Sequence, residues 1–206
     1  MISNAELRAR ARAALGNNIF NNVWLWSLLL YIIYPVSYTT LSKLNIPTFI
    51  FYGLTGVSIA GVFLSISRTG EAPKFVRIFD GFKNFGPNLL LGLMITLFTF
   101  LWMLLFIIPG IVKMFSYSMA YFIRVDHPEY DWKRCMHESE DMMRGHRWRL
   151  FCLMLSFIGW IIVGILALGV GILWVAPYIE TTTAVFYDDL KNNRLRPLKE
   201  SEAVEN

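Results

Sequence analysis

The sequence predicts an all-α protein, a polytopic membrane bundle of six transmembrane helices arranged as three hairpins, with amphipathic helices on the cytoplasmic face. Its composition is 55% hydrophobic and only 17% charged, which is more apolar than a soluble domain of 206 residues usually is. Seventeen of the nineteen Lys and Arg residues fall in four segments, and pairs of apolar stretches separate those segments. Because the translocation machinery retains Lys and Arg near a span on the cytoplasmic side, this pattern indicates both the number of spans and their direction.

The first hairpin comprises apolar runs at 23–41 and 47–66, joined by a tight turn at Asn45-Ile46-Pro47. Each run has about the 20 residues that cross a hydrocarbon core of about 30 Å. Three arginines precede the first run, as in a signal peptide. The run is too long for the apolar region of a signal peptide, and no A-x-A-like cleavage site follows it. We therefore expect an uncleaved first span.

The second hairpin lies within the apolar region 87–125. A single helix of this length would measure about 58 Å, nearly twice the core, so the chain must fold back. Pro109-Gly110 marks the expected turn, since proline cannot continue a helix interior and glycine permits a sharp bend. The expected spans are 87–108 and 111–125.

The third hairpin lies within the apolar region that begins at Arg149 and ends near Leu190. Gly169-Val170-Gly171 divides it into expected spans at 149–168 and 172–189. The outer turns of the second and third hairpins are about 60 residues apart, so the three hairpins could be parallel repeats or could share only general constraints.

The orientation follows from the four basic segments, which are the N-terminal segment, the loops after the second and fourth spans, and the tail. Six spans with both termini inside place all four in the cytoplasm, whereas five spans would place a basic segment outside. Lys43 and Lys113 are the two exceptions, at or near outer turns. The whole chain, 1–206, is expected to be one integral membrane domain.

Amphipathic helices are expected at 4–15, 74–85 and 130–148. The second has an aromatic stripe at helical spacing, formed by Phe75, Ile78, Phe79, Phe82 and Phe85. Such a helix belongs at the membrane interface, either as a connector or as a surface for lipids or a partner. The third has several methionines on one side, which either contact a cytosolic or membrane protein partner or pack under the bundle itself.

Polar residues inside the expected spans form a candidate polar seam. Lys113, Ser116 and Tyr117 share one face of the fourth span, and Glu180, Thr183 and Tyr187 share one face of the sixth. Charged residues within spans are costly and are functional candidates. The seam either lines a polar cavity or joins the helices by hydrogen bonds.

Signals for other chemistry are absent from the sequence. No P-loop and no G-x-S-x-G motif occurs, and three histidines share one loop without the spacing of a metal site. We expect no metal and no cofactor. The basic residues flank apolar runs, so we also expect no nucleic-acid partner, and membrane lipids remain the expected partners.

Several motifs resemble a known family. They are Ala11–Asn17, Ile108-Pro109-Gly110-Ile111 with Phe115–Met119, Ser139 with Met143–His146, Leu155–Trp160, and Pro177-Tyr178 with Phe186-Tyr187. In these motifs the chain resembles the uncharacterised bacterial integral membrane family called domain of unknown function 975. The resemblance implies a multi-pass protein of the bacterial cytoplasmic (inner) membrane, and it implies no activity.

The leading functional expectation is a non-enzymatic membrane protein, an accessory that interacts with lipids or a partner. The alternative is a small transporter or channel that uses the polar seam between spans four and six. A membrane-embedded lipid enzyme is third, since the acidic residues near the inner face are too few to indicate a reaction. No catalytic residue can be assigned from the sequence.

Overall fold

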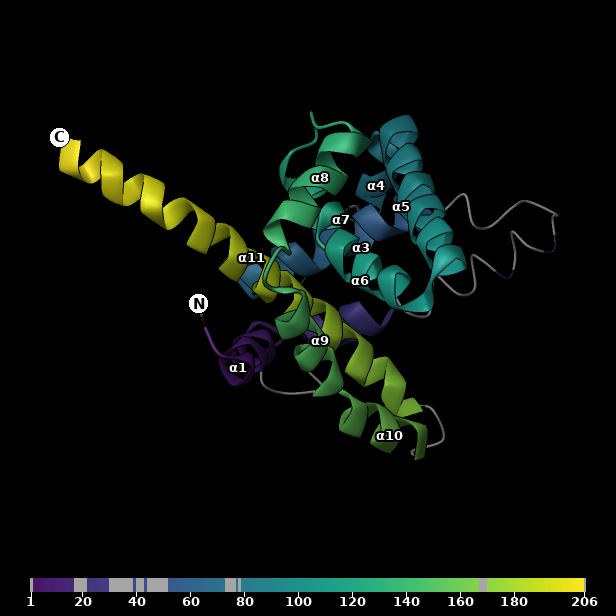
Figure 1. Ribbon diagram of the computed structural model, residues 1–206. Coiled ribbons are helices and arrows are strands. Elements are labelled where there is room, and N and C mark those ends of the chain that lie inside the picture. Colours follow the sequence, from purple (N-terminus) through teal and green to yellow (C-terminus); the bar gives the residue numbers. More distant parts are fainter. Residues whose placement is uncertain are drawn as a thin grey trace.

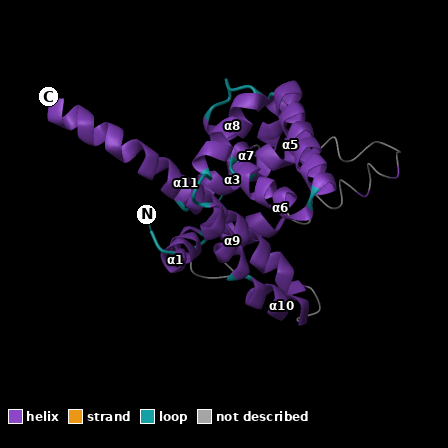
Figure 2. Cartoon of the chain, in the orientation of Figure 1, coloured by secondary structure: helices purple, strands orange, loops and turns teal. Residues whose placement is uncertain are grey.

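The computed structural model describes residues 2–16, 22–29, 39, 43, 52–72, 77, 79–166 and 170–205, with side chains described as far as residue 194. Regular structure in these ranges is helical throughout, with no strand (Figure 2). The expected all-α class is therefore confirmed. Most of the expected first span, the turn at 45–47, and Phe75 and Ile78 of the aromatic stripe lie outside the described residues.

Helix α1 (Asn4–Ala14) begins at Ser3, whose Oγ accepts a hydrogen bond of 3.2 Å from the backbone N–H of Glu6. This is the usual way in which a serine satisfies a free N–H at a helix start. Leu7 and Ala11 on the apolar face of α1 are fully buried, as is Leu15, which follows the helix. This face packs against α11 and α3. A further helical segment, 22–29, buries Val23, Trp24 and Leu28.

Helix α3 (Tyr52–Thr69) is the centre of the molecule. It contacts α5, α7 and α4 on one side and α11 and α1 on the other. In Figure 1 these neighbours form two groups with α3 between them. Its buried side chains supply much of the core: Leu54, Val57, Ala60, Val62, Phe63, Leu64 and Ile66.

A short helix, α4 (Asp80–Lys83), precedes the long apolar helix α5 (Phe85–Leu105). Asn84, with φ −112° and ψ 63°, separates them, so the expected continuous helix at 74–85 is interrupted before Phe85. Gly81 of α4 lies directly against α3. A Cβ at this position would be 2.0 Å from the carbonyl oxygen of Leu54, so only glycine allows this approach.

The fold-back after α5 occurs at Phe106, three residues before the expected turn. Phe106 is extended, with φ −155° and ψ 137°, and α6 (Ile107–Tyr117) starts directly after it. The expected turn at Pro109-Gly110 is wrong, since both residues lie within the first turn of α6. Proline is tolerated there because the N–H groups of a first helical turn have no intrahelical acceptor, so the missing N–H of proline breaks no hydrogen bond. A turn at residues 118–119 then separates α6 from α7 (Ala120–Asp126), so the expected fourth span consists of two helices.

Helix α8 (Trp132–Met142) is shorter than the expected helix at 130–148. Turn residues 143–146 end it, and Gly145 there has φ +81°, a left-handed conformation that glycine adopts readily. The helix packs beside α5 and α6, and the rings of Phe98 and Trp132 stack with centroids 6.3 Å apart. Its methionine side is therefore occupied within the chain: Met136, Met142 and the following Met143 are all buried.

The last part of the chain forms α9 (Arg147–Leu155), α10 (Ile158–Leu166) and α11 (Val170–Glu205). Helix α11 has 36 residues and continues past the expected end of the sixth span at 189. Val170 and Gly171, which were expected in an outer turn, belong to its first turn. In Figure 1 the C-terminal part of α11 projects away from all the other helices.

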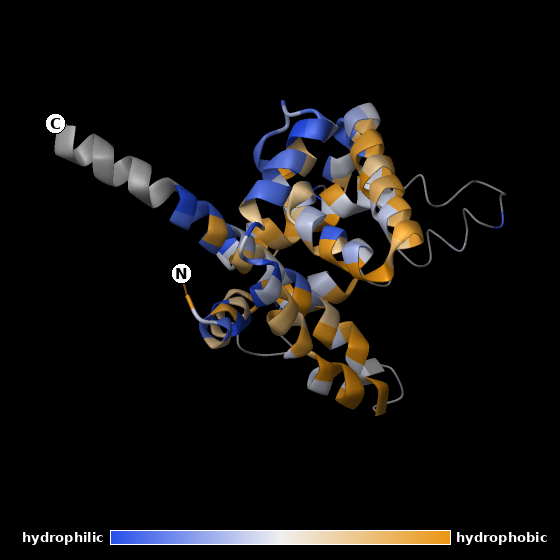
Figure 3. Ribbon diagram, viewed as in Figure 1, coloured by the Kyte–Doolittle hydropathy of each residue, from blue (hydrophilic) through white to orange (hydrophobic). Residues whose placement is uncertain are grey.

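Two segments are long and apolar enough to cross a membrane by length and composition, Phe85–Leu105 with 21 residues and Arg147–Leu166 with 20. Figure 3 shows α5 and α10 as the most apolar parts of the molecule, and α8 as one of the polar parts. Many large apolar side chains of α5 and α10 are exposed, for example Leu104 of α5 at 73% and Leu166 of α10 at 78%. The hydrophobic surface on these helices is thus directed outward and is not used for the core.

Candidate functional site

A cluster of four charged side chains and one tyrosine joins the C-terminal ends of α3 and α7 to α11. We name it the α3–α7–α11 charge cluster, and its members are Arg68, Asp126, Tyr187, Asp188 and Lys191. Arg68 donates to both oxygens of Asp126 at 2.9 Å and to Asp188 at 2.7 Å. Asp126 also accepts from Lys191 Nζ at 2.5 Å and from the hydroxyl of Tyr187 at 3.0 Å.

The electrostatics of this cluster favour the charged forms of Asp126 and Arg68. Burial alone would raise the pKa of Asp126, but the hydrogen bonds from Arg68 and Lys191 outweigh burial and lower the pKa to about 2. The hydrogen bond to Asp126 raises the pKa of Arg68 above its ordinary value, against the effect of burial. A general acid or base works best with a pKa near the operating pH. The cluster is therefore suited to holding three helices together and unsuited to moving protons near neutral pH.

A second charged contact ties α9 to α11 and to the N-terminus. Arg149 donates to Asp189 at 2.8 Å and to the backbone oxygen of Ile2, and the N–H of Ile2 donates to Asp189 at 3.4 Å. A cavity of about 620 Å³ lies beside both charged contacts, and Arg10, Asp188 and Asn193 are among its lining residues. Its ionisable groups are of both signs, so the cavity does not select one charge.

Lys113 of the expected seam pairs with α8. Its Nζ lies 2.6 Å from Glu140 Oε1, and the rings of Trp102 and Tyr117 lie within 5.4 and 5.6 Å of the ammonium. Arg147 is also 3.7 Å from Glu140. This contact was not anticipated, because Glu140 was assigned to a helix at the cytoplasmic surface and Lys113 to a position near the outer turn.

The other seam residues lie on two helices with different neighbours. Ser116 and Tyr117 are on α6, which packs against α5, α8 and α9, whereas Glu180, Thr183 and Tyr187 are on α11, which packs against α3, α1 and α10. Ser116 and Thr183 each donate to a carbonyl of their own helix, at 2.7 and 2.9 Å. Near its end the α11 face meets the fourth expected span, where the ring of Tyr187 stacks on that of Phe122 of α7 with centroids 5.5 Å apart.

The described members of the aromatic stripe are exposed. Phe79, Phe82 and Phe85 are 52%, 38% and 48% exposed, and the first two rings lie 6.3 Å apart. Gly81 holds this segment against α3, because its N–H donates to Ser58 Oγ at 3.0 Å. The stripe is thus presented outward on a backbone that is fixed from behind.

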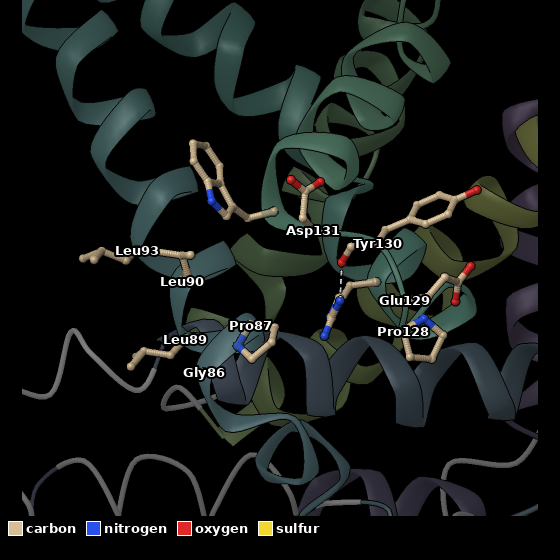
Figure 4. Close-up of a pocket in the computed structure, with 11 residues that line it drawn as sticks. Gly86, Pro87, Leu89, Leu90, Leu93, Pro128, Glu129, Tyr130 and Asp131 are labelled. Atoms are coloured by element: carbon tan, nitrogen blue, oxygen red, sulfur yellow. Dashed lines mark hydrogen bonds between the residues drawn. The ribbon is translucent and has the colours of Figure 1, made fainter.

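A further cavity, of about 650 Å³, lies between the start of α5 and the loop that joins α7 to α8 (Figure 4). We name it the Arg124 cavity. It is lined by Gly86, Pro87, Leu89, Leu90, Leu93, Arg124, Pro128, Glu129, Tyr130, Asp131 and Trp132. Figure 4 shows the leucines on one side and Glu129 and Asp131 on the other, so the cavity has an apolar and a polar wall.

Arg124 is the most deeply buried charged residue of this cavity, with only 4% of its surface exposed. Its Nε donates to Asn88 Oδ1 at 2.8 Å and its Nη1 to the carbonyl oxygen of Tyr130. Asn88 in turn donates to the carbonyl oxygen of Gly81 at 2.7 Å. A continuous set of hydrogen bonds therefore links the α7–α8 loop through α5 to α4.

A family model described as "Protein of unknown function (DUF975)" matches residues 1–116 and 105–194. The chain belongs to the DUF975 family. The resemblance seen in its motifs is thereby confirmed. No curated protein and no solved structure matches the chain.

For this DUF975 protein, sequence reasoning missed both the charge cluster and the Arg124 cavity. One signal could have found the cluster: Arg68, Asp126 and Asp188 each lie at the inner end of a different expected span, so the topology already places them at one depth. Sequence reasoning placed Arg124 on the same face of the fourth span as Lys113 and Tyr117, and counted it among the basic residues of the loop that follows. Among the described residues, no group of three or more His, Cys, Asp or Glu side chains could hold a metal ion.

Proposed function

We propose that this DUF975 protein is a non-enzymatic, multi-pass protein of the bacterial cytoplasmic membrane, with six spans and both termini in the cytoplasm, that serves as a lipid- or partner-interacting accessory. The observation that carries the proposal is the outward apolar surface of α5 and α10, since a soluble protein of this size rarely leaves so large an apolar surface exposed. Lipid chains would cover that surface in a bilayer. The four basic segments supply the orientation.

The interior supports an accessory role over transport. The three threonines of α11 bond within their own helix: Thr181, Thr182 and Thr183 donate to carbonyls four residues earlier at 2.6–2.9 Å. Glu180 lines neither the cavity beside the charge cluster nor the Arg124 cavity. The charge cluster is balanced, with two carboxylates facing two cations. In the part of the chain that the structure describes, these features are those of a packed bundle.

A protein partner on the 130–148 segment would meet its charged side, because the methionine side is buried in the bundle. The outward side chains include Lys133, Arg134, His137 and Arg144. We propose this side as the cytosolic contact, and lipids as the partners of the exposed aromatic stripe.

The experiment that tests the proposed function combines membrane extraction with topology mapping. The protein should stay in the membrane at alkaline pH and dissolve only with detergent. In a background with Cys135 and Cys152 replaced by serine, an impermeant maleimide added to whole cells should label Lys43→Cys and should leave Glu71→Cys and Arg144→Cys unlabelled until the cells are opened. Labelling of Arg144→Cys from outside would overturn the topology, and release without detergent would overturn the membrane role.

A further inference from the structure

The Arg124 cavity has the composition of a site for an amphiphile. We propose that it binds the headgroup of a zwitterionic phospholipid that carries a phosphate and a primary ammonium, of the phosphatidylethanolamine class. This inference rests on the proposed membrane function, since the lipid must reach the cavity from the bilayer. A volume of about 650 Å³ is within the range of small-molecule sites.

The phosphate would bind to Arg124. Within the described part of the chain this guanidinium has hydrogen bonds only from Nε and Nη1, and no carboxylate lies within 4 Å of it. A buried cation without a counter-charge is costly, and such groups are normally paired. Nη2 has no described acceptor, so its two N–H groups remain for an anion. Guanidinium groups bind phosphate oxygens through strong, charge-assisted hydrogen bonds.

The ammonium would bind to the opposite, acidic wall. Glu129 Oε1 lies 3.1 Å from His127 Nδ1, and Asp131 Oδ1 accepts the backbone N–H of Arg134 at 2.9 Å. A purely anionic headgroup would face both carboxylates without compensation, whereas a zwitterion places its positive end beside them. A quaternary ammonium carries the same charge but has no N–H to donate.

The acyl chains would leave along the leucine wall. Leu90 and Leu93 line the cavity and are 37% and 41% exposed, and the exposed apolar face of α5 continues from them through Leu97 and Leu101. The cavity lies at the start of α5, which is the inner end of the expected third span and therefore the depth of lipid headgroups. Trp132 at this level has the amphipathic ring that favours the membrane interface.

The test is lipid binding by the full-length protein in detergent, measured by native mass spectrometry against phosphatidylethanolamine, phosphatidylcholine and phosphatidylglycerol with matched chains. We expect the first to bind tightest. Arg124→Gln should weaken the binding of phosphatidylethanolamine roughly tenfold, and Arg124→Lys should weaken it less. The exposed control Arg144→Gln should bind this lipid as the unchanged protein does. Because Arg124 also bridges α5 and the α7–α8 loop, the exposed Glu129→Gln provides a second variant that leaves this bridge intact. It should reduce the preference for phosphatidylethanolamine over phosphatidylglycerol, and Glu71→Gln is its control.

Equal binding of the three lipids by the unchanged protein, or equal binding by Arg124→Gln and Arg144→Gln, would overturn the proposal. Displacement of the lipid by millimolar phosphate as readily as by added lipid would also overturn it, since the site would then be one for a free anion. In each of these cases the protein would still require detergent and keep its topology, so the proposed membrane function would stand. Release from the membrane without detergent would overturn that function separately.

Discussion

Arg68 and Asp126 face one another through two parallel hydrogen bonds of 2.9 Å, although 58 residues separate them in the chain. The Asp126 side chain is only 8% exposed, while Arg68 is 41% exposed and also reaches Asp188. Asp126 is therefore the shared acceptor on which the ends of α3, α7 and α11 converge.

Replacing Asp126 by Asn should lower the free energy of unfolding by about 2 kcal/mol, because it removes the carboxylate that pairs with Lys191 and leaves Arg68 with Asp188 alone. Asp188→Asn is the matched control. It should cost less than about 1 kcal/mol, since Asp188 is more exposed and Arg68 keeps Asp126. Denaturant unfolding in a mild detergent, followed by tryptophan fluorescence, measures both. Equal losses for the two variants would contradict the central position of Asp126.

Acid should weaken the protein through the same carboxylate. The pKa of Asp126 is about 2 in the folded protein and near 3.8 in an unfolded chain, so its stabilisation is fully present above about pH 4. It should be lost as the pH falls from about 4 to 2, because protonation removes the acceptor of three donors. The unfolding midpoint of the unchanged protein should fall more steeply over this interval than that of Asp126→Asn. Parallel curves would show that Asp126 has no lowered pKa.

The Lys113–Glu140 contact should show energetic coupling between α6 and α8. In a double-mutant cycle with Lys113→Met and Glu140→Gln, we expect a coupling free energy of about 1 kcal/mol. Glu140→Gln leaves the partly buried Lys113 without its carboxylate, and Lys113→Met leaves Glu140 with only Arg147 at 3.7 Å. The double variant removes both charges of the Lys113–Glu140 pair. The pair of Arg134→Gln with Glu140→Gln serves as control, since Arg134 does not pair with Glu140 in the structure. Additive losses at Lys113 and Glu140 would mean that the two helices are held by other contacts.

Gly81→Ala should destabilise the protein by about 1–3 kcal/mol, because the new methyl group would overlap the Leu54 carbonyl and Ser58 Oγ. Gly86→Ala, five residues away in α5, has no atom within 4 Å of the added Cβ. It should stabilise the helix by about 0.5–1 kcal/mol. Thermal unfolding of the two variants side by side measures the contrast. A neutral Gly81→Ala would mean that α4 is not seated on α3.

Local features of the fold could be predicted from the sequence where they depend on neighbouring residues. The helix at 4–15 differs from α1 by one residue, because Ser3 and the spacing of Leu7 and Ala11 are local signals. The prediction of a turn at Pro109-Gly110 was wrong because proline occurs both after the end of a helix and in the first turn of the next helix. The placement of Phe106 decides between them, and no local signal marks it.

The candidate sites could not be predicted, since they depend on which helices become neighbours. Arg68 and Asp188 are 120 residues apart in the chain, and the packing of α8 beside α5 and α6 has no signature in the periodicity of α8. Arg124 reads as one more basic residue at the end of a span. Its lack of a counter-charge is visible only once α5 and the α7–α8 loop lie around it.

The continuity of α11 has a mechanical consequence. A helix of 36 residues is about 54 Å long, and it has no break between the part that packs on α3 and α10 and the part that projects from the bundle. A rigid tilt of this helix would have the α3–α7–α11 charge cluster as its pivot, because the cluster ties α11 to α3 and α7. A tilt of 10° about that pivot would move the tail by roughly 4 Å over the last 17 residues. Such a tilt would couple a shift of the apolar half of α11 to a displacement of its polar end.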